Sequence, residues 1–238
     1  MANIVIYKAI FGDYDKKPKP PPKDFDKTIK FILLADKEIA ADGWETIKVN
    51  HKNNPVLNNR NCKMFPWKYF DADKSMYLDG HIEFGNDFAE FFNRLTSSDY
   101  HFAVNRHRAK GNISDELVRC IDNSKITKNE IKKVFDSNLI LNATAVECGM
   151  IFRDHNNQKI KAHAERWWWY FNNICPRDQL SVQTAAKDTD MTITVLDTDF
   201  SNDNFFQIVG HSNWLFKILK ARLRILLRVL LHGTLINE

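Results

Sequence analysis

The chain has 238 residues, of which 44% are hydrophobic and 12% aromatic, so it is long and apolar enough to bury a sizeable core. Its formal net charge of +4 is small for this length and gives no indication of a nucleic-acid partner. Four widely spaced cysteines without a Cys-x-x-Cys pair predict free thiols. No apolar run reaches the roughly 18 residues that predict a membrane-spanning helix.

Strands and helices are predicted to alternate along most of the chain, from its apolar runs and the spacing of apolar residues. In chain order, the predicted elements are strands at residues 3–10, 29–36 and 44–49, a helix at 58–65, a strand and turn at 74–84, a helix at 86–95, a strand at 101–107, helices at 113–123 and 128–138, a strand at 145–155, and helices at 162–174 and 177–188. A proline-rich basic stretch at 16–27 is expected to be an exposed loop. The alternation predicts an α/β fold with a mixed, mainly parallel sheet flanked by helices, whose ligands bind beyond the carboxyl ends of the strands.

The first candidate site is Asp79-Gly80-His81, which follows an apolar run and so lies at a predicted strand end. Residues two apart in an extended or tightly turned segment project to the same side, so the carboxylate and the imidazole can share one divalent ion. Oxygen and nitrogen ligands together suit Mn²⁺ or Mg²⁺, with substrate phosphates completing the coordination shell. The alternative is a plain β-turn with an exposed histidine.

Arg60 and Lys63 lie three residues apart, on one face of a predicted helix. A bidentate guanidinium beside an ammonium group suits a diphosphate. The alternative is a solvated helix face.

Arg177, Asp178 and Gln179 open another predicted helix. Asp178 is either a helix cap or a rigidly held functional carboxylate. Three consecutive tryptophans at 167–169 cover most faces of their helix, so either the helix is packed between two layers or one ring stacks on a sugar. His211 is a lone histidine without a local motif.

Taken in order, "YKAIFGDYD", "FILLAD", "SMYLDGHIEF", "ECGMIFRDHN", "WW" and "RDQLS" resemble a glycosyltransferase-domain family found in bacterial polysaccharide loci and in plant cell-wall biosynthesis. The resemblance covers Ile4 to Ser181. More distantly, the pattern is similar to retaining GT-A galactosyl- and glucosyltransferases of the glycogenin and lipopolysaccharide type, which have a DxD motif, a later Asp-Gln pair and a C-terminal histidine.

The resemblance implies a GT-A-like domain over 1–211 that moves a sugar from a nucleotide-sugar donor to a bacterial surface glycan such as capsule or lipopolysaccharide, weakly favouring retention. It implies that the base and ribose of the donor bind at Ala9, Phe11, Tyr14 and Asp36, and the diphosphate at Arg60, Lys63, Asp79 and Gly80. It implies that Mn²⁺ or Mg²⁺ binds at Asp79, His81 and His211. It implies that Asp178 and Gln179 line the sugar pocket as the catalytic pair, and that the acceptor or sugar contacts His107, Glu147 and Trp168.

Several positions depart from the family pattern: His81 stands where Asn or Asp is usual, Trp67 replaces a histidine and Lys110 replaces an arginine. A non-catalytic nucleotide- or carbohydrate-binding module of the same fold is therefore an alternative. A nucleotidyltransferase is a further one, although the segment after the first strand has only one glycine, where that class carries a glycine-rich loop.

The tail at 212–238 is predicted to be a basic amphipathic helix. Lys217, Lys220, Arg224 and Arg228 form one stripe, and leucines and isoleucines fill the opposite side. Such a helix suits an anionic lipid surface, and the alternative is a terminal helix packed on the core or in a dimer contact. With the lipid-linked acceptor that the family resemblance implies, this predicts a cytoplasmic protein peripheral to the inner face of the membrane.

Overall fold

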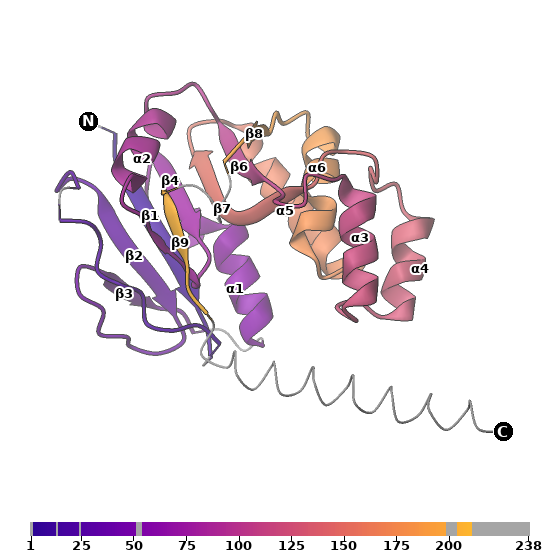
Figure 1. Ribbon diagram of the computed structural model, residues 1–238, viewed down its shortest axis with the longest axis horizontal. Helices are drawn as coiled ribbons and strands as arrows, with labels where there is room; N and C mark the ends of the chain where they lie inside the picture. The colour runs from indigo at the N-terminus through magenta and orange to yellow at the C-terminus, as the bar shows by residue number, and fades with distance from the viewer. Residues whose placement is uncertain (1, 13, 24, 51–53, 199–203, 211–238) are drawn as a thin grey trace.

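The computed structural model describes residues 2–12, 14–23, 25–50, 54–198 and 204–210 (Figure 1). His211 and the tail at 212–238, and with them the boundary between the two predicted domains, lie outside the described residues. Within the described residues, no helix is long and apolar enough to cross a membrane.

A seven-stranded sheet forms the centre of the fold, in the order β3-β2-β1-β4-β7-β6-β8. Its strands are β1 (Ile4–Ile10), β2 (Lys30–Ala35), β3 (Glu45–Lys48), β4 (Lys74–Leu78), β6 (Phe102–Arg106), β7 (Val146–Asp154) and β8 (Thr194–Leu196). Only β7 runs against its neighbours, because it pairs antiparallel with β4 and β6 while the other pairs are parallel. The predicted mixed, mainly parallel α/β sheet is therefore confirmed. A separate two-stranded sheet joins β5 (Ile82–Phe84) to β9 (Phe206–Ile208).

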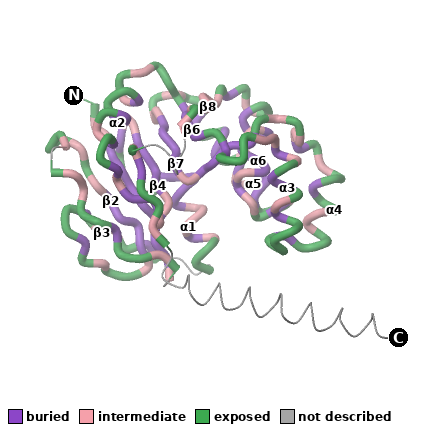
Figure 2. The backbone as a smooth tube through the Cα atoms, viewed as in Figure 1, coloured by how far each residue is buried: buried purple, intermediate pink, exposed green. Residues whose placement is uncertain are grey.

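Helices cover both faces of the large sheet (Figure 1). They are α1 (Pro55–Met64), the 3₁₀ turn η1 (Pro66–Lys68), α2 (Phe88–Thr96), α3 (Ile113–Asp122), α4 (Lys128–Asp136), α5 (Lys159–Asn173) and α6 (Asp178–Asp188). One core cluster joins the sheet to α1, α5 and α6, and a second joins its other face to α2 and the small sheet. The central strands β1, β2, β4, β6 and β7 are accordingly buried along most of their length, whereas the edge strands β3 and β8 are not (Figure 2).

Local capping explains where α1 begins, which is three residues earlier than the sequence pattern predicted. The Asn54 side chain accepts a hydrogen bond from the Leu57 amide at 2.9 Å, and Pro55 occupies the first helical position. Proline suits this position because its missing N–H would have no acceptor there. The helix ends at Met64, before Pro66, as predicted.

The proline-rich segment at 16–27 is mostly exposed, as predicted, but it is attached to neighbouring elements around Pro18 and Lys19. Pro18 is buried. The Lys19 amide donates to Glu83 Oε2 at 3.2 Å, and the Lys19 carbonyl accepts from Trp44 Nε1 at 2.9 Å. The expected exposed loop is therefore confirmed for most of its described residues, and its contacts with neighbouring elements are the part that the sequence pattern did not predict.

A buried ion pair fixes the segment that leads out of the β4 turn. Lys8 is in β1, on the same face as Ile6, and both it and Glu83 are almost completely buried. Lys8 Nζ donates to the Ile82 carbonyl at 2.5 Å and to Glu83 Oε1 at 2.9 Å. Burial lowers the pKa of Lys8, and the Glu83 carboxylate opposes that shift.

We predict that Glu83→Gln lowers the free energy of unfolding by about 3 kcal/mol or more, because it leaves the Lys8 ammonium buried without its counter-charge. Urea denaturation measures the loss. The double variant Lys8→Met/Glu83→Gln should recover much of it, since the pair is then removed rather than broken. Lys132→Met, which breaks an exposed ion pair with Asp136 on α4, is the control and should change little. Parental stability in Glu83→Gln would show that this pair is not held in charged form.

Candidate functional site

A pocket of about 450 Å³ opens at the end of the sheet where β4 and β6 finish and β7 begins. Its wall is formed by Tyr14, Asp79, His81, Ile82, His107, Arg108, Glu116, Arg119, Asn123, Lys125, Glu147, Gly149, Arg177, Gln179 and Ile208. This is the edge at which open α/β sheets bind ligands. A second hollow of about 610 Å³, around His101 and Asp154, lies toward the opposite end of β7 and includes none of the predicted site residues.

The Asp79-Gly80-His81 turn is held firmly beside β7. The Asp79 amide donates to the Gly149 carbonyl at 2.8 Å, and the Ile82 amide closes the turn onto the Asp79 carbonyl at 2.9 Å. A side chain at position 80 would meet the Asp15 carboxylate at 2.5 Å, which explains the glycine. The turn alternative is thus correct as local geometry, and the same turn brings Asp79 and His81 to the pocket wall.

The Asp178 carboxylate is buried and bound by two cations from α1. Lys63 Nζ donates to Asp178 Oδ2 at 2.7 Å, and Arg60 Nε lies 3.3 Å from the same oxygen. Burial on its own raises the pKa of Asp178, but Arg60, Lys63 and Arg177 outweigh it and hold the pKa well below its usual range. Lys63 Nζ also lies 3.6 Å from Asp79 Oδ1, so one ammonium group links both acidic motifs.

The capping alternative for Asp178 is wrong as to position only: its Oδ2 is bound by the ion pair, while its Oδ1 accepts from the Gln179 amide at 3.2 Å in the first turn of α6. Arg177 takes the N-cap position of α6, and Asp178 is the first helical residue. The solvated-face alternative for Lys63 is also wrong, since its side chain is only 1% exposed. Arg60 and Lys63 do share a helix face as predicted, but they contact Asp178 rather than line the pocket.

His107, Glu116 and Glu147 meet on the pocket wall. The Ala109 amide donates to His107 Nδ1 at 3.2 Å, which leaves Nε2 as the protonated nitrogen of the neutral ring. His107 Nε2 lies 3.4 Å from Glu116 Oε2 and 3.8 Å from Glu147 Oε1. Burial lowers the pKa of His107 more than the two carboxylates raise it, and Arg119 and Arg108 lower it further.

The residues predicted to bind base and ribose are divided between core and surface. Ala9 and Phe11 are buried, and Ala9 presents only its carbonyl, which accepts from Asn59 Nδ2 at 2.7 Å. Tyr14 is 48% exposed and lines the pocket. Asp36 Oδ2 accepts from the Gly12 amide at 2.8 Å, while its buried Oδ1 has no hydrogen-bond partner among the described residues.

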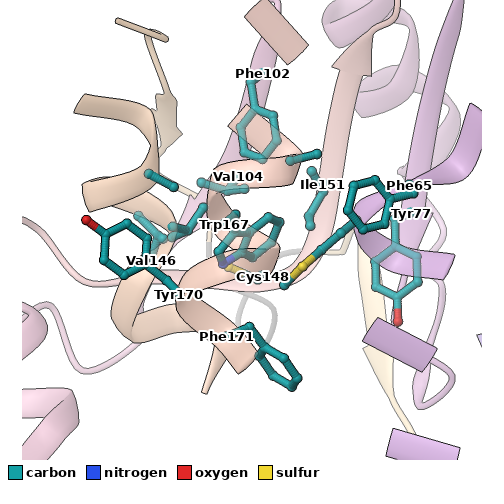
Figure 3. Close-up of a cluster of buried hydrophobic side chains, with 14 of the residues drawn as sticks. Phe65, Tyr77, Phe102, Val104, Val146, Cys148, Ile151, Trp167, Tyr170 and Phe171 are labelled. Atoms are coloured by element: carbon teal, nitrogen blue, oxygen red, sulfur yellow. The ribbon is translucent and has the colours of Figure 1, made fainter. Parts of the chain in front are cut away.

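The three tryptophans of α5 have three different environments, as their spacing predicted. Trp167 is completely buried in the core, where its Nε1 donates to the Asp178 carbonyl at 2.9 Å (Figure 3). Trp169 is 45% exposed. Trp168 is half-buried against Phe65 and Phe171 and is not among the pocket-lining residues, so its role as a sugar contact stays a prediction.

Two of the three predicted metal ligands, Asp79 and His81, lie together on the pocket wall. The third, His211, lies outside the described residues. Among the described residues, no group of three or more His, Cys, Asp or Glu side chains is placed to hold an ion. Magnesium sites in phosphate-transferring proteins commonly take one or two carboxylates plus substrate phosphates and water, so the Asp79 carboxylate fits a substrate-completed site, to which His81 would add a nitrogen ligand.

The sequence predictions missed the cations on α3 and just beyond it, Arg119 and Lys125, as well as the role of Glu116. A signal was present, because Glu116 interrupts the apolar stripe of Ile113, Leu117 and Cys120, and all four are buried. A charged residue on a buried helix face indicates an ion-pair network.

No family model and no curated protein matches this chain. Solved structures with a similar fold include 4-diphosphocytidyl-2C-methyl-D-erythritol synthase from Anaerococcus prevotii, with a TM-score of 0.46 and 11% identity over 86% of this chain and 90% of that one. Galactosyltransferase LgtC in complex with donor and acceptor sugar analogues has a TM-score of 0.42 and 11% identity over 76% and 69%. Glycosyltransferase GlyE from Streptococcus pneumoniae has a TM-score of 0.45 and 12% identity over 84% and 46%. Two of these three are glycosyltransferases by name, but likenesses this low do not establish a shared reaction.

We predict that Asp178→Asn lowers the free energy of unfolding at neutral pH by about 3 kcal/mol or more, because Lys63 and Arg60 lose a buried counter-charge. A carboxyl whose pKa is depressed by folding stabilises the protein above its unfolded value of about 3.9, and this contribution is lost as pH falls below that value. The difference in free energy of unfolding between parent and variant should therefore become smaller below about pH 4.

Urea denaturation of both proteins across this range measures this difference. His163, whose pKa burial lowers to about 4, destabilises both proteins alike on acidification, so only the difference reports on Asp178. Asp136→Asn, on the surface of α4, is the matched control and should stay parallel to the parent. If parent and Asp178→Asn are equally stable at neutral pH, or if the difference in their free energies of unfolding stays the same in acid, the ion-pair role of Asp178 is contradicted.

Proposed function

We propose that this chain is a glycosyltransferase that moves a sugar from a nucleotide-sugar donor to an acceptor hydroxyl in the pocket. The observation that carries the proposal is that Asp79 and His81 from the end of β4 and Gln179 from the start of α6 share one pocket at the carboxyl ends of parallel strands. The Lys63 ammonium ties the two motifs together through Asp79 and Asp178. This support is independent of the low likeness to solved structures.

Asp79 and His81 would hold Mn²⁺ or Mg²⁺, with His211 as a further candidate ligand. When bound, the ion supplies Lewis-acid stabilisation of the departing nucleoside diphosphate. Tyr14 and Asp36 would bind the base and ribose, and the unpaired Asp36 Oδ1 offers an acceptor for a base N–H. Gln179 would contact the donor sugar, since it lines the pocket beside the fixed Asp178.

Glu147 and His107 are proposed to contact the acceptor. Glu147 accepts from Arg108 Nε at 3.1 Å and faces the protonated nitrogen of His107, so its carboxylate is oriented from both sides. A carboxylate held in this way can accept a hydrogen bond from an acceptor hydroxyl and so orient it. The stereochemical outcome that the sequence resemblance favours, retention, remains part of the proposal, as does a bacterial glycan as acceptor.

We predict that Asp79→Asn abolishes Mn²⁺-dependent binding of nucleotide sugars while the protein stays folded. The substitution keeps an oxygen for the Tyr77 hydroxyl, which donates to Asp79 Oδ1 at 2.7 Å, but it removes the charge. A donor that binds only the native state raises the melting temperature. At a donor concentration of one hundred times its dissociation constant, it stabilises the native state by about 2.7 kcal/mol. A thermal-shift panel of UDP-, GDP-, dTDP- and CDP-sugars, with and without Mn²⁺, measures this.

Asp136→Asn serves as the charge-matched control. A parent that responds to no nucleotide sugar, or an Asp79→Asn variant that responds as the parent does, would refute the proposed site. Binding by the parent without hydrolysis or transfer to any acceptor would favour the non-catalytic module.

We further propose that the segment 212–238 binds an anionic membrane surface at the cytoplasmic face, bringing the pocket to a lipid-linked acceptor. The support is the basic stripe in the sequence, where each basic residue near such a surface adds about 1 kcal/mol of attraction. The full chain should therefore sediment with phosphatidylserine-containing vesicles at low salt, and a chain ending at Trp214 should not. High salt should weaken the attraction. Failure of the full chain to bind such vesicles, or unfolding of the truncated chain, would contradict this role.

A further inference from the structure

The pocket wall is rich in cations that the proposed donor and acceptor contacts do not use. Arg119 and Lys125, from α3 and the segment after it, and Arg177, which precedes α6, line the pocket. They come from elements that pack directly against each other, since α3 contacts α6. Arg119 and Arg177 are joined through Glu116, and Lys125 lines the same pocket from the segment after α3.

This part of the pocket wall has fewer carboxylates than cations. Glu116 Oε2 accepts from Arg119 Nε at 3.0 Å, and Glu116 Oε1 lies 3.8 Å from Arg177 Nη2. Glu116 is thus shared by two guanidinium groups, and Lys125 adds a third positive charge. Arg119 Nη2 also lies 3.4 Å from His107 Nδ1, and Arg177 also interacts electrostatically with Asp178. The Arg177 Nε atom is buried and has no hydrogen-bond acceptor among the described residues. A buried, unpaired donor on a charged group is costly unless a ligand supplies the acceptor.

The other cations near the site are already neutralised. Arg108 pairs one-to-one with Glu147. Arg60 and Lys63 both bind Asp178, and Lys63 is almost completely buried. Arg119, Lys125 and Arg177 are therefore the pocket-lining cations without a carboxylate of their own, since Arg119 and Arg177 share Glu116.

We infer that Arg119, Lys125 and Arg177 form a phosphate-binding subsite. Guanidinium groups match phosphate oxygens with paired N–H donors, and Glu116 holds both guanidiniums in place before a ligand arrives, which lowers the entropy lost on binding. The inference deepens the proposed function and rests on it for the carrier of the phosphate, which is either the nucleoside diphosphate of the donor or the diphosphate of a lipid-linked acceptor.

The test measures the binding of three probes to the full chain by titration calorimetry at constant ionic strength. Pyrophosphate without metal tests the subsite itself, UDP with Mn²⁺ represents the donor, and geranyl diphosphate represents a lipid diphosphate. Arg119→Gln and Lys125→Gln remove one positive charge each from half-exposed or exposed side chains, so folding should be retained. Arg94→Gln on α2 and Lys132→Gln on α4 are charge-matched controls away from the pocket.

We expect pyrophosphate to bind the parent and to bind Arg119→Gln about tenfold or more weakly, the scale of a lost hydrogen bond to a charged group. The controls should bind as the parent does. A parallel loss of UDP affinity assigns the subsite to the donor, and a loss confined to geranyl diphosphate assigns it to the acceptor. Either result supports the subsite.

The inference is overturned if the parent does not bind pyrophosphate at millimolar concentration, if Arg119→Gln and Lys125→Gln both bind it as the parent does, or if the controls lose affinity equally. If the parent binds nucleotide sugars, and Arg119→Gln and Lys125→Gln bind UDP and pyrophosphate as tightly as the parent does, the subsite is rejected and the proposed function stands. Pyrophosphate binding through these residues in a protein that binds no nucleotide sugar would retain the subsite and reject the proposed function.

Discussion

The ion pair between Lys63 and Asp178 is the interaction on which the rest of the site depends. It joins the last turn of α1 to the first residue of α6, and the same ammonium group reaches Asp79 at the end of β4. Lys63 is positioned through its backbone as well, because its carbonyl accepts from Arg153 Nη2 at 2.8 Å and from the Tyr7 hydroxyl at 3.2 Å. A buried pair is only weak evidence of net stabilisation, but breaking it is strongly unfavourable, so it fixes one arrangement of three elements.

That arrangement fixes the position of Asp178 and Gln179 at the start of α6. The Asp178 backbone is held from the opposite side by Trp167, whose indole is itself completely buried between α5 and the sheet. Gln179 therefore begins α6 next to a residue fixed at both its carboxylate and its carbonyl. Small displacements of a positioned group cost large factors in rate, and a start of α6 fixed in this way limits them.

The sequence predicted what depends on local pattern, and it missed what depends on distant charges. Apolar runs located β1, β2 and β4, and their alternation with helices was sufficient to predict a mainly parallel sheet. The reversed direction of β7 was not predictable, since no local pattern distinguishes it. Likewise Lys8 and Arg153 lie inside apolar strand runs. Only the fold shows that Lys8 donates to Glu83 and that Arg153 donates to the Lys63 carbonyl. Asp178 was predicted to matter, but its counter-charges on α1 lie too far along the chain to be paired from spacing alone.

Different elements of the fold supply charges of different sign to the pocket. The Asp79 turn supplies a carboxylate and an imidazole, α3 and the start of α6 supply the Arg119 and Arg177 guanidiniums, and β7 supplies Glu147. His107 lies between the Glu116 and Glu147 carboxylates, and Arg119 Nη2 is 3.4 Å from its Nδ1, so cations and carboxylates alternate over short distances. Under the proposed function, a phosphate is attracted by the guanidiniums and repelled by the neighbouring carboxylates, and such repulsion is strong in a partly desolvated site. Charges that the fold holds in place therefore limit where in the pocket a phosphate can bind.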